Sequence, residues 1–323
     1  MVGRITRWRL FPVGLLVCSR AMYIGELAAL ATAVLWAVTS LFFTIASRLI
    51  GVGSVNRLRL GLAMVLVALF HWLLTGSLFP FGTEAWRWGI LSISSVAGLV
   101  IGDGALFLAF VYIGPRLTLL VMTIVPMLSA VFSWFCFGET LGMLEQVGIL
   151  VTLLAIGWVI SEKPNTDGAT QLYPAEKYTI GIVLALIGAL GQTVNLVVTK
   201  YALMDGYSAL SATEVRIFVA LILLWVLAGC QGHLVRSIKQ MRNPRAAFFV
   251  MAGAIAGPFL GIWFSYVAIQ NTRVGIASTI MATPPLLLIP LSALFFNEKT
   301  SLRGWLGTLV AFMGVALLLW ESS

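Results

Sequence analysis

One stretch of this chain occurs again later in the chain at a constant spacing. Residues 98–151 align without a gap onto residues 257–310, each position matching the one 159 positions further on. Apart from Leu–Leu matches, the identical pairs are Gly98/Gly257, Gly102/Gly261, Ala109/Ala268, Met122/Met281, Pro126/Pro285, Ser133/Ser292, Phe137/Phe296, Glu139/Glu298, Gly148/Gly307 and Val151/Val310. Matches at glycine, proline and glutamate are informative because these residues are uncommon in apolar sequence and have specific backbone roles. The duplication therefore predicts two related halves.

The composition is that of a membrane protein. The chain is 60% hydrophobic and 10% charged, whereas soluble domains carry about 25% charged residues. The apolar runs are long and continuous, as in bilayer-spanning helices of about 20 residues, and they lack the alternation of β-barrel strands. We predict an all-α integral membrane protein that contacts membrane lipids. The net charge of +8 comes from basic residues in connectors and at the N-terminus, which favours lipid headgroups over nucleic acid as partner.

Ten transmembrane helices are expected, five in each half. The apolar segments are 22–47, 58–75, 86–113, 116–137, 143–161, 177–200, 209–231, 245–270, 274–296 and 302–320. A basic N-terminal extension covers 1–21, and a polar linker at 162–176 separates a first repeat at 22–161 from a second at 177–320. A tight turn is expected at 113–116, after the third helix. An odd number of helices per half predicts inverted repeats related by a two-fold axis in the membrane plane.

Asp103 is the acidic residue that lies deepest in a predicted helix. An acid inside a membrane is costly and is a functional candidate for that reason. It can bind a cationic group or carry a coupling proton, and the alternative is a structural pair with Arg59, Arg216 or a hydroxyl. Arg59 and Arg216 occupy equivalent helix ends, where they either extend to the headgroups or form an anion-binding pair at the repeat axis.

Amides and aromatic residues complete the predicted substrate site. Trp36 and Gln192 are at equivalent positions in the first and sixth helices, and Asn195 follows Gln192 by three positions, on the same helix face. Trp263 and Tyr266 are one turn apart on the eighth helix. Buried amides need partners, and a substrate is one candidate. We predict that these five residues bind substrate together with the deep acid, although aromatic residues in membrane helices also serve as interface anchors.

Glycine pairs recur in the third and eighth helices. Gly98 and Gly102 form one pair with four-residue spacing, and Gly257 and Gly261 form the other. Small residues at this spacing let helices approach closely in a membrane, where lipid gives no hydrophobic drive for association. We predict that these four glycines pack helices together, either as a seam that moves or as static contacts.

Prolines and terminal glutamates mark the fourth and ninth helices. Pro126, Pro284 and Pro285 lie inside apolar segments, where each removes a backbone bond and kinks the helix. Each kink is expected to act as a hinge or to form part of a cavity wall. The alternative is a fixed kink that has no role in motion. Glu139 and Glu298 follow the same two helices. Each is expected to cap the next helix through its dipole, with a gating ion pair as the alternative.

These motifs resemble one known family. The fourth helix reads Thr-Ile-Val-Pro and ends in Phe-Gly-Glu-Thr, the ninth ends in Phe-Asn-Glu-Lys, and both third and eighth helices are rich in small residues. Residues 22–320 thus resemble the EamA-type branch of the drug/metabolite transporter superfamily, with Asn in place of Gly in the second terminal motif. The resemblance implies a carrier of the inner (plasma) membrane that moves a small polar or amphipathic metabolite by alternating access. An amino-acid-like compound or a drug, moved by export, is the first expectation.

Other classes are less well supported by the residues. His71 and His233 are far apart and no hydrolase or metal-binding motif is present, so we expect no catalytic residues, no cofactor and no metal. Transport is expected to be proton-coupled through Asp103 or to be facilitated diffusion, by a monomer or a homodimer. An intramembrane lipid-modifying enzyme would need two converging acids or a His–Asp pair in the bundle, and only one acid lies deep in a predicted helix. A scaffold or sensor that transports nothing would lack a solvent-filled cavity.

Overall fold

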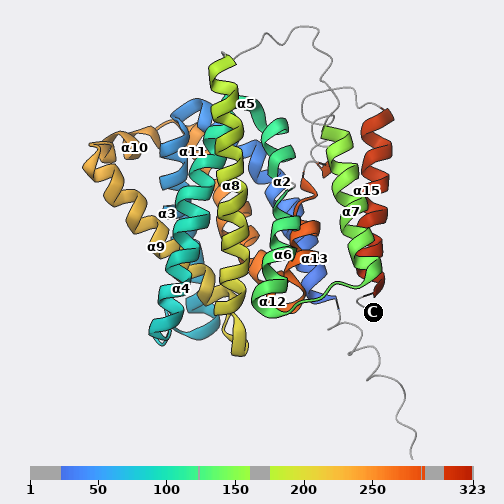
Figure 1. Cartoon of the computed structure of the whole chain (residues 1–323). Coiled ribbons are helices and arrows are strands. Elements are labelled where there is room, and N and C mark those ends of the chain that lie inside the picture. Colours follow the sequence, from blue (N-terminus) through green and yellow to red (C-terminus); the bar gives the residue numbers. More distant parts are fainter. Residues whose placement is uncertain (1–22, 123, 161–174, 285, 288–301, 322–323) are drawn as a thin grey trace, which may run out of the picture.

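The fold is a bundle of helices, seen in a computed structural model (Figure 1). The structure describes residues 23–122, 124–160, 175–284, 286–287 and 302–321. The basic extension at 1–21, most of the linker, Pro285 and Glu298 lie outside these residues. Within the described part, all regular elements are helical. This agrees with a membrane environment, where a helix satisfies its own backbone groups without water.

Helices of the first half follow one another with short connections. They are α2 (Ile24–Ile50), α3 (Val52–Thr75), α4 (Ala85–Ser95), the π-helix η1 (Val96–Gly102), α5 (Asp103–Met122), α6 (Ile124–Phe137) and α7 (Met143–Ile160).

The second half repeats this order, with two short additional helices. Its elements are α8 (Ala175–Ala202), the 3-10 turn η2 (Met204–Gly206), α9 (Ala209–Cys230), α10 (Leu234–Gln240), α11 (Pro244–Ala254), the π-helix η3 (Ile255–Gly261), α12 (Ile262–Asn271), α13 (Val274–Met281) and α15 (Leu302–Glu321).

Six helices of the described part are long and apolar enough to cross a membrane. They are Ile24–Ile50, Val52–Thr75, Ala85–Ile113, Thr179–Ala202, Ala209–Cys230 and Pro244–Asn271. Two shorter apolar helices, Ile124–Phe137 and Met143–Ala155, lie between them in the chain. The chain is therefore a multi-pass integral membrane protein, and the count of ten spans stays a prediction.

Two predicted boundaries are wrong. The turn expected at 113–116 does not form, because α5 continues through Pro115 to Met122. A proline inside a membrane helix is tolerated when neighbouring groups satisfy the carbonyl that it leaves free. The second helix begins at Val52 rather than at 58, because Gly51, with φ +82°, ends α2 and lets α3 start directly.

The sequence repeat reappears as a backbone irregularity. The π-helical segments Val96–Gly102 and Ile255–Gly261 occupy positions that differ by 159, the spacing of the sequence repeat. A π-helical segment is rare and usually occurs where function requires a local departure from α-helix. The duplicated glycine motif therefore specifies one unusual backbone in both halves.

Each half packs its first helix against the third helix of the other half. α2 contacts α11, η3 and α12, while α8 contacts α4, η1 and α5. Equivalent helices also pack on each other, α3 on α9, α6 on α13 and α7 on α15. In Figure 1, α2 begins at the lower edge of the bundle and α8 at the upper edge, so these two equivalent helices run in opposite directions. The halves are interleaved and share one interior.

Glycines make the contacts between halves possible. A Cβ at Gly191 in α8 would lie 2.4 Å from the carbonyl oxygen of Ala97 and 2.9 Å from Gly102 Cα in η1. On the other side, a Cβ at Gly257 would meet the Thr39 side chain at 2.7 Å. At Gly191 two backbones touch, whereas at Gly257 the missing side chain leaves room for one from α2.

We predict that Gly191→Ala destabilises the protein by about 1–3 kcal/mol, the usual cost of overpacking a tight contact. The matched control is Gly89→Ala in α4, where a Cβ would meet nothing within 4 Å. Thermal unfolding in detergent should show a lower Tm for the first variant and an equal or higher Tm for the second, because alanine is the better helix former. Equal Tm values for both variants would contradict the packing argument.

Candidate functional site

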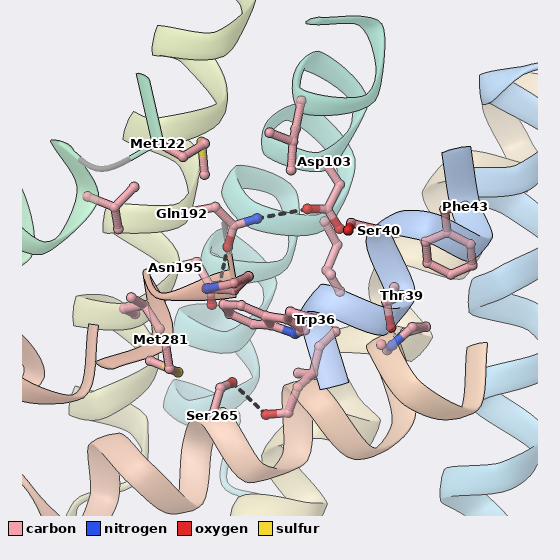
Figure 2. Close-up of a pocket in the computed structure, with 18 of the residues that line it drawn as sticks. Trp36, Thr39, Ser40, Phe43, Asp103, Met122, Gln192, Asn195, Ser265 and Met281 are labelled. Atoms are coloured by element: carbon pink, nitrogen blue, oxygen red, sulfur yellow. Dashed lines mark hydrogen bonds between the residues drawn. The ribbon is translucent and has the colours of Figure 1, made fainter. Parts of the chain in front are cut away.

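A cavity of about 180 Å³ lies where the two halves meet. It is lined from α2, α3, η1, α5 and α6 of the first half and from α8, η3, α12 and α13 of the second. Most of its wall is apolar, with aromatic rings from Trp36, Phe43, Phe107, Phe110 and Tyr266. Figure 2 shows the polar side chains gathered on one side, around Asp103, Gln192 and Asn195.

These polar side chains form a continuous chain of hydrogen bonds. Gln192 Nε2 donates to Asp103 Oδ1 at 2.8 Å, and Asn195 Nδ2 donates to Gln192 Oε1 at 2.9 Å (Figure 2). The Tyr266 hydroxyl donates to Asn195 Oδ1 at 3.1 Å. Because the acceptor of one residue meets the donor of the next, the orientation of every amide is fixed. Asp103, Gln192, Asn195 and Tyr266 thus form a prearranged polar strip in the cavity wall.

Arg59 pairs with the deep acid. Its Nη2 lies 2.5 Å from Asp103 Oδ2, and Nε and Nη2 both donate to Asn56 Oδ1 at 2.9 and 2.7 Å. The guanidinium lies 4.8 Å from the centre of the Phe107 ring and 5.4 Å from that of Phe43, a cation–π arrangement. Arg59 is 4% exposed, so its expected extension to the headgroups is wrong. The reason is the early start of α3, which places Arg59 two turns inside the helix.

The positive charge of Arg59 balances the negative charge of Asp103. Both carboxylate oxygens have a partner, Arg59 on one side and Gln192 on the other. The geometry therefore agrees with the structural pairing that the sequence left open.

The structure brings five of the six predicted substrate residues together. Trp36, Asp103, Gln192, Asn195 and Tyr266 all line the cavity.

The sixth predicted residue lies elsewhere. The cavity-facing side of α12 consists of Ile262, Ser265 and Tyr266. Trp263 lies outside this stripe and packs against Phe70, with 5.1 Å between ring centroids. Helical spacing places residues 263 and 266 near each other, but only packing decides which of the two faces the cavity.

The predicted kink residues have different surroundings. Pro284 lines the cavity, whereas Pro126 is buried in α6 next to Val125, which lines it. Pro285 is outside the described residues. Pro258 in η3 also lines the cavity and was not singled out from the sequence.

Several lining residues were missed in the sequence. Thr39, Ser40 and Phe43 follow Trp36 at spacings of three, four and seven residues. This is the pattern of one helix face, so extending the Trp36 face along α2 would have found them. Ser265 and Ser278, from α12 and α13, have no comparable signal.

Ion pairs join the halves near one edge of the bundle. Lys200 at the end of α8 pairs with Glu139 of the first half, and Lys200 Nζ also donates to the Thr272 carbonyl at 3.1 Å. Arg273 pairs with Glu145 of the first half. In Figure 1 the ends of α6, α8 and α12 meet at the lower edge.

Glu139 does not cap the helix that follows it. Its Oε2 accepts from the Val274 backbone N–H at 3.2 Å, so it caps α13 of the opposite half. Glu145 accepts from Gly142 N at 2.8 Å instead, at the start of α7. The expected cap on the next helix is therefore wrong for Glu139, and its charge serves the contact between halves.

We predict that Gly98→Ala distorts the polar strip. A Cβ there would lie 2.9 Å from Asn195 Cβ and 3.0 Å from Arg216 Nη2. Overpacking costs about 1–3 kcal/mol, and a loss of that size in ligand binding corresponds to an affinity about 5-fold to 150-fold weaker. Gly104→Ala is the control, because a Cβ there meets nothing within 4 Å. Substrate-dependent flux in proteoliposomes should fall for the first variant alone, and equal flux in both would argue against a role for this contact.

Comparisons with known proteins agree with this architecture. The model of the EamA-like transporter family matches residues 23–161 and 179–320, one match in each half. A crystal structure of another protein, 19% identical, has a TM-score of 0.72 and covers 94% of this chain and 98% of that chain. At this identity the likeness shows a shared fold. In all, 28 chains of solved structures match. No curated protein sequence matches significantly.

Proposed function

The chain belongs to the EamA-like transporter family, and on that premise we propose that it is a secondary carrier of a small amphipathic metabolite. The proposed location is the inner (plasma) membrane, and the proposed direction is export. The family assignment establishes a membrane transporter of the drug/metabolite transporter superfamily. The substrate site and the mechanism are what we propose in addition.

The observation that carries the proposal is a shared cavity with a polar strip. Both halves line it, and Asp103, Gln192 and Asn195 present fixed donors and acceptors on one side. Transporters with inverted repeats bind substrate at the repeat interface near the bilayer midplane. A cavity of about 150 Å³ holds one benzene ring, so the volume and the aromatic lining favour a compact body with one polar end. An amino-acid-like compound or a small drug meets this description.

Alternating access is the proposed mechanism. Ten spans arranged as inverted repeats would let one half exchange conformation with the other around a fixed site. The pairs Lys200–Glu139 and Arg273–Glu145 connect the halves at one edge. In this proposal they form a gate that must separate when the cavity opens on that side. Tight glycine contacts elsewhere support rigid-body motion.

The first test is transport by the purified chain. Uptake and counterflow in proteoliposomes should be measured for amino acids, amines and nucleosides, with and without a pH gradient. We predict that Asp103→Asn lowers flux by about tenfold or more, because losing one partner of a buried pair leaves Arg59 uncompensated. Loss of pH-driven uptake in the variant, with counterflow still measurable, would assign proton coupling to Asp103. Flux insensitive to the gradient would indicate facilitated diffusion, and no flux of any compound would reject the carrier.

The gate can be tested by cysteine accessibility. We predict that Glu139→Gln speeds labelling of Ser278→Cys by a membrane-impermeant maleimide, because Ser278 lines the cavity and is 2% exposed. The native cysteines should first be replaced by serine. Glu84→Gln is the control, since Glu84 pairs with Arg87 inside the first half. Equal labelling rates in both variants would show that the Lys200–Glu139 pair does not hold this edge closed.

A further inference from the structure

Arg216 in α9 is a buried cation without a counterion among the described residues. Its side chain is fully buried, and Nε and Nη1 have no hydrogen-bond partner. Nη2 donates to the Ser94 carbonyl at 3.0 Å, and the guanidinium lies 4.9 Å from the centre of the Tyr266 ring. Both contacts are weak compensation for a full charge, because arginine stays protonated in proteins and a buried charge requires pairing.

Two buried acids, Asp103 and Glu214, are the candidate counterions for Arg216. Asp103 is bonded to Arg59 and Gln192. Glu214 lies two positions before Arg216 on α9 and is 3.7 Å from His71 on α3. Neither forms an ion pair with Arg216.

The two repeats differ at the position that would supply the missing acid. Arg216 corresponds to Arg59 in the first half, and Arg59 has Asp103 as its counterion. The repeat spacing of 159 places Ile262 at the position equivalent to Asp103. The fold thus keeps both arginines and supplies an acid for one of them. Arg59, Arg216 and Asp103 together carry one net positive charge, which lies in the cavity wall and in the layer of side chains behind it.

Arg216 lies one side chain behind the cavity wall. The Tyr266 ring that it faces and the Asn195 side chain both line the cavity, and these two residues are hydrogen-bonded to each other at 3.1 Å. Gly98 leaves the space that the guanidinium occupies, since a Cβ there would lie 3.0 Å from Nη2. The Tyr266 ring would have to move for the guanidinium to touch a ligand in the cavity.

We propose that Arg216 recognises an anionic group of the substrate, so that the carried compound is an organic monoanion. This rests on the proposed carrier function and narrows its substrate class. A guanidinium binds the oxygens of a carboxylate or a phosphate in a two-point geometry. The rest of the cavity, with Trp36, Phe107 and Phe110, receives an apolar or aromatic body. The anion supplies the negative charge that Asp103 provides in the first half and that Ile262 cannot provide.

The test uses the full chain, purified and in proteoliposomes, with probes of one shape. The probes are 3-phenylpropanoate, its primary amide, 3-phenylpropylamine, phenylalanine and phenyl phosphate. Ligand-induced thermal stabilisation measures binding, and initial uptake rates measure transport. The carboxylate should stabilise and enter with the wild type, and the isosteric amide and the amine should not. Phenyl phosphate and phenylalanine then show whether phosphate replaces carboxylate and whether a zwitterion is accepted.

Variants separate the charge from the fold. Arg216→Gln should weaken carboxylate binding by about tenfold or more, and Arg216→Lys should retain part of it. Arg245→Gln removes an exposed arginine and should change nothing. Ile262→Asp introduces the acid found at this position in the first half, so it should weaken carboxylate binding more than Ile262→Asn does.

The outcomes distinguish this inference from the carrier proposal. Uptake of the amide or the amine in preference to the carboxylate overturns the anion assignment and leaves the carrier intact. Carboxylate binding that depends on Arg216, without uptake of any probe, supports the assignment and rejects the carrier. Stabilisation by none of the probes, or equal carboxylate binding in Arg216→Gln and wild type, overturns the assignment.

Discussion

The contact on which this structure depends is the close approach of two π-helical segments to the first helix of the opposite half. η1 packs on α8 and η3 packs on α2, through Gly102, Gly191 and Gly257. In lipid, helices gain no hydrophobic energy by associating, so van der Waals packing and hydrogen bonds must hold them together. Because both contacts cross between the halves, they create one interior shared by the two repeats, and the cavity lies in it.

The scaffold is symmetric, but the chemistry placed on it is not. Trp36 and Gln192 are equivalent positions, and one contributes a ring while the other contributes an amide to the same cavity. Asp103 has Ile262 as its equivalent. In the proposed mechanism the duplicated backbone allows two conformations of equal architecture, and the differences between the copies give a single asymmetric site. A carrier needs both properties, since alternation requires the symmetry and recognition requires a defined orientation of the substrate.

Buried charge is where sequence reasoning failed most clearly. Arg59 and Arg216 were placed near helix ends, where long basic side chains usually reach the headgroups. Both are buried, because α3 starts earlier than its apolar run suggests and because α9 is enclosed by α3, α4 and α12. The distance of a residue from the membrane surface depends on where its helix begins and on which neighbours cover it. A hydrophobicity profile does not contain that information.

The sequence alone determined the class, the two halves, the family and most of the polar strip. Those follow from local properties: apolar length, repeat spacing, and the rarity of acids and amides in membrane helices. Only the tertiary structure decided that Asp103 pairs with Arg59, that Trp263 faces Phe70 rather than the cavity, and that Glu139 caps a helix of the other half. Each of these depends on a contact between segments far apart in the chain, and side-chain partners at such distances are chosen by packing geometry.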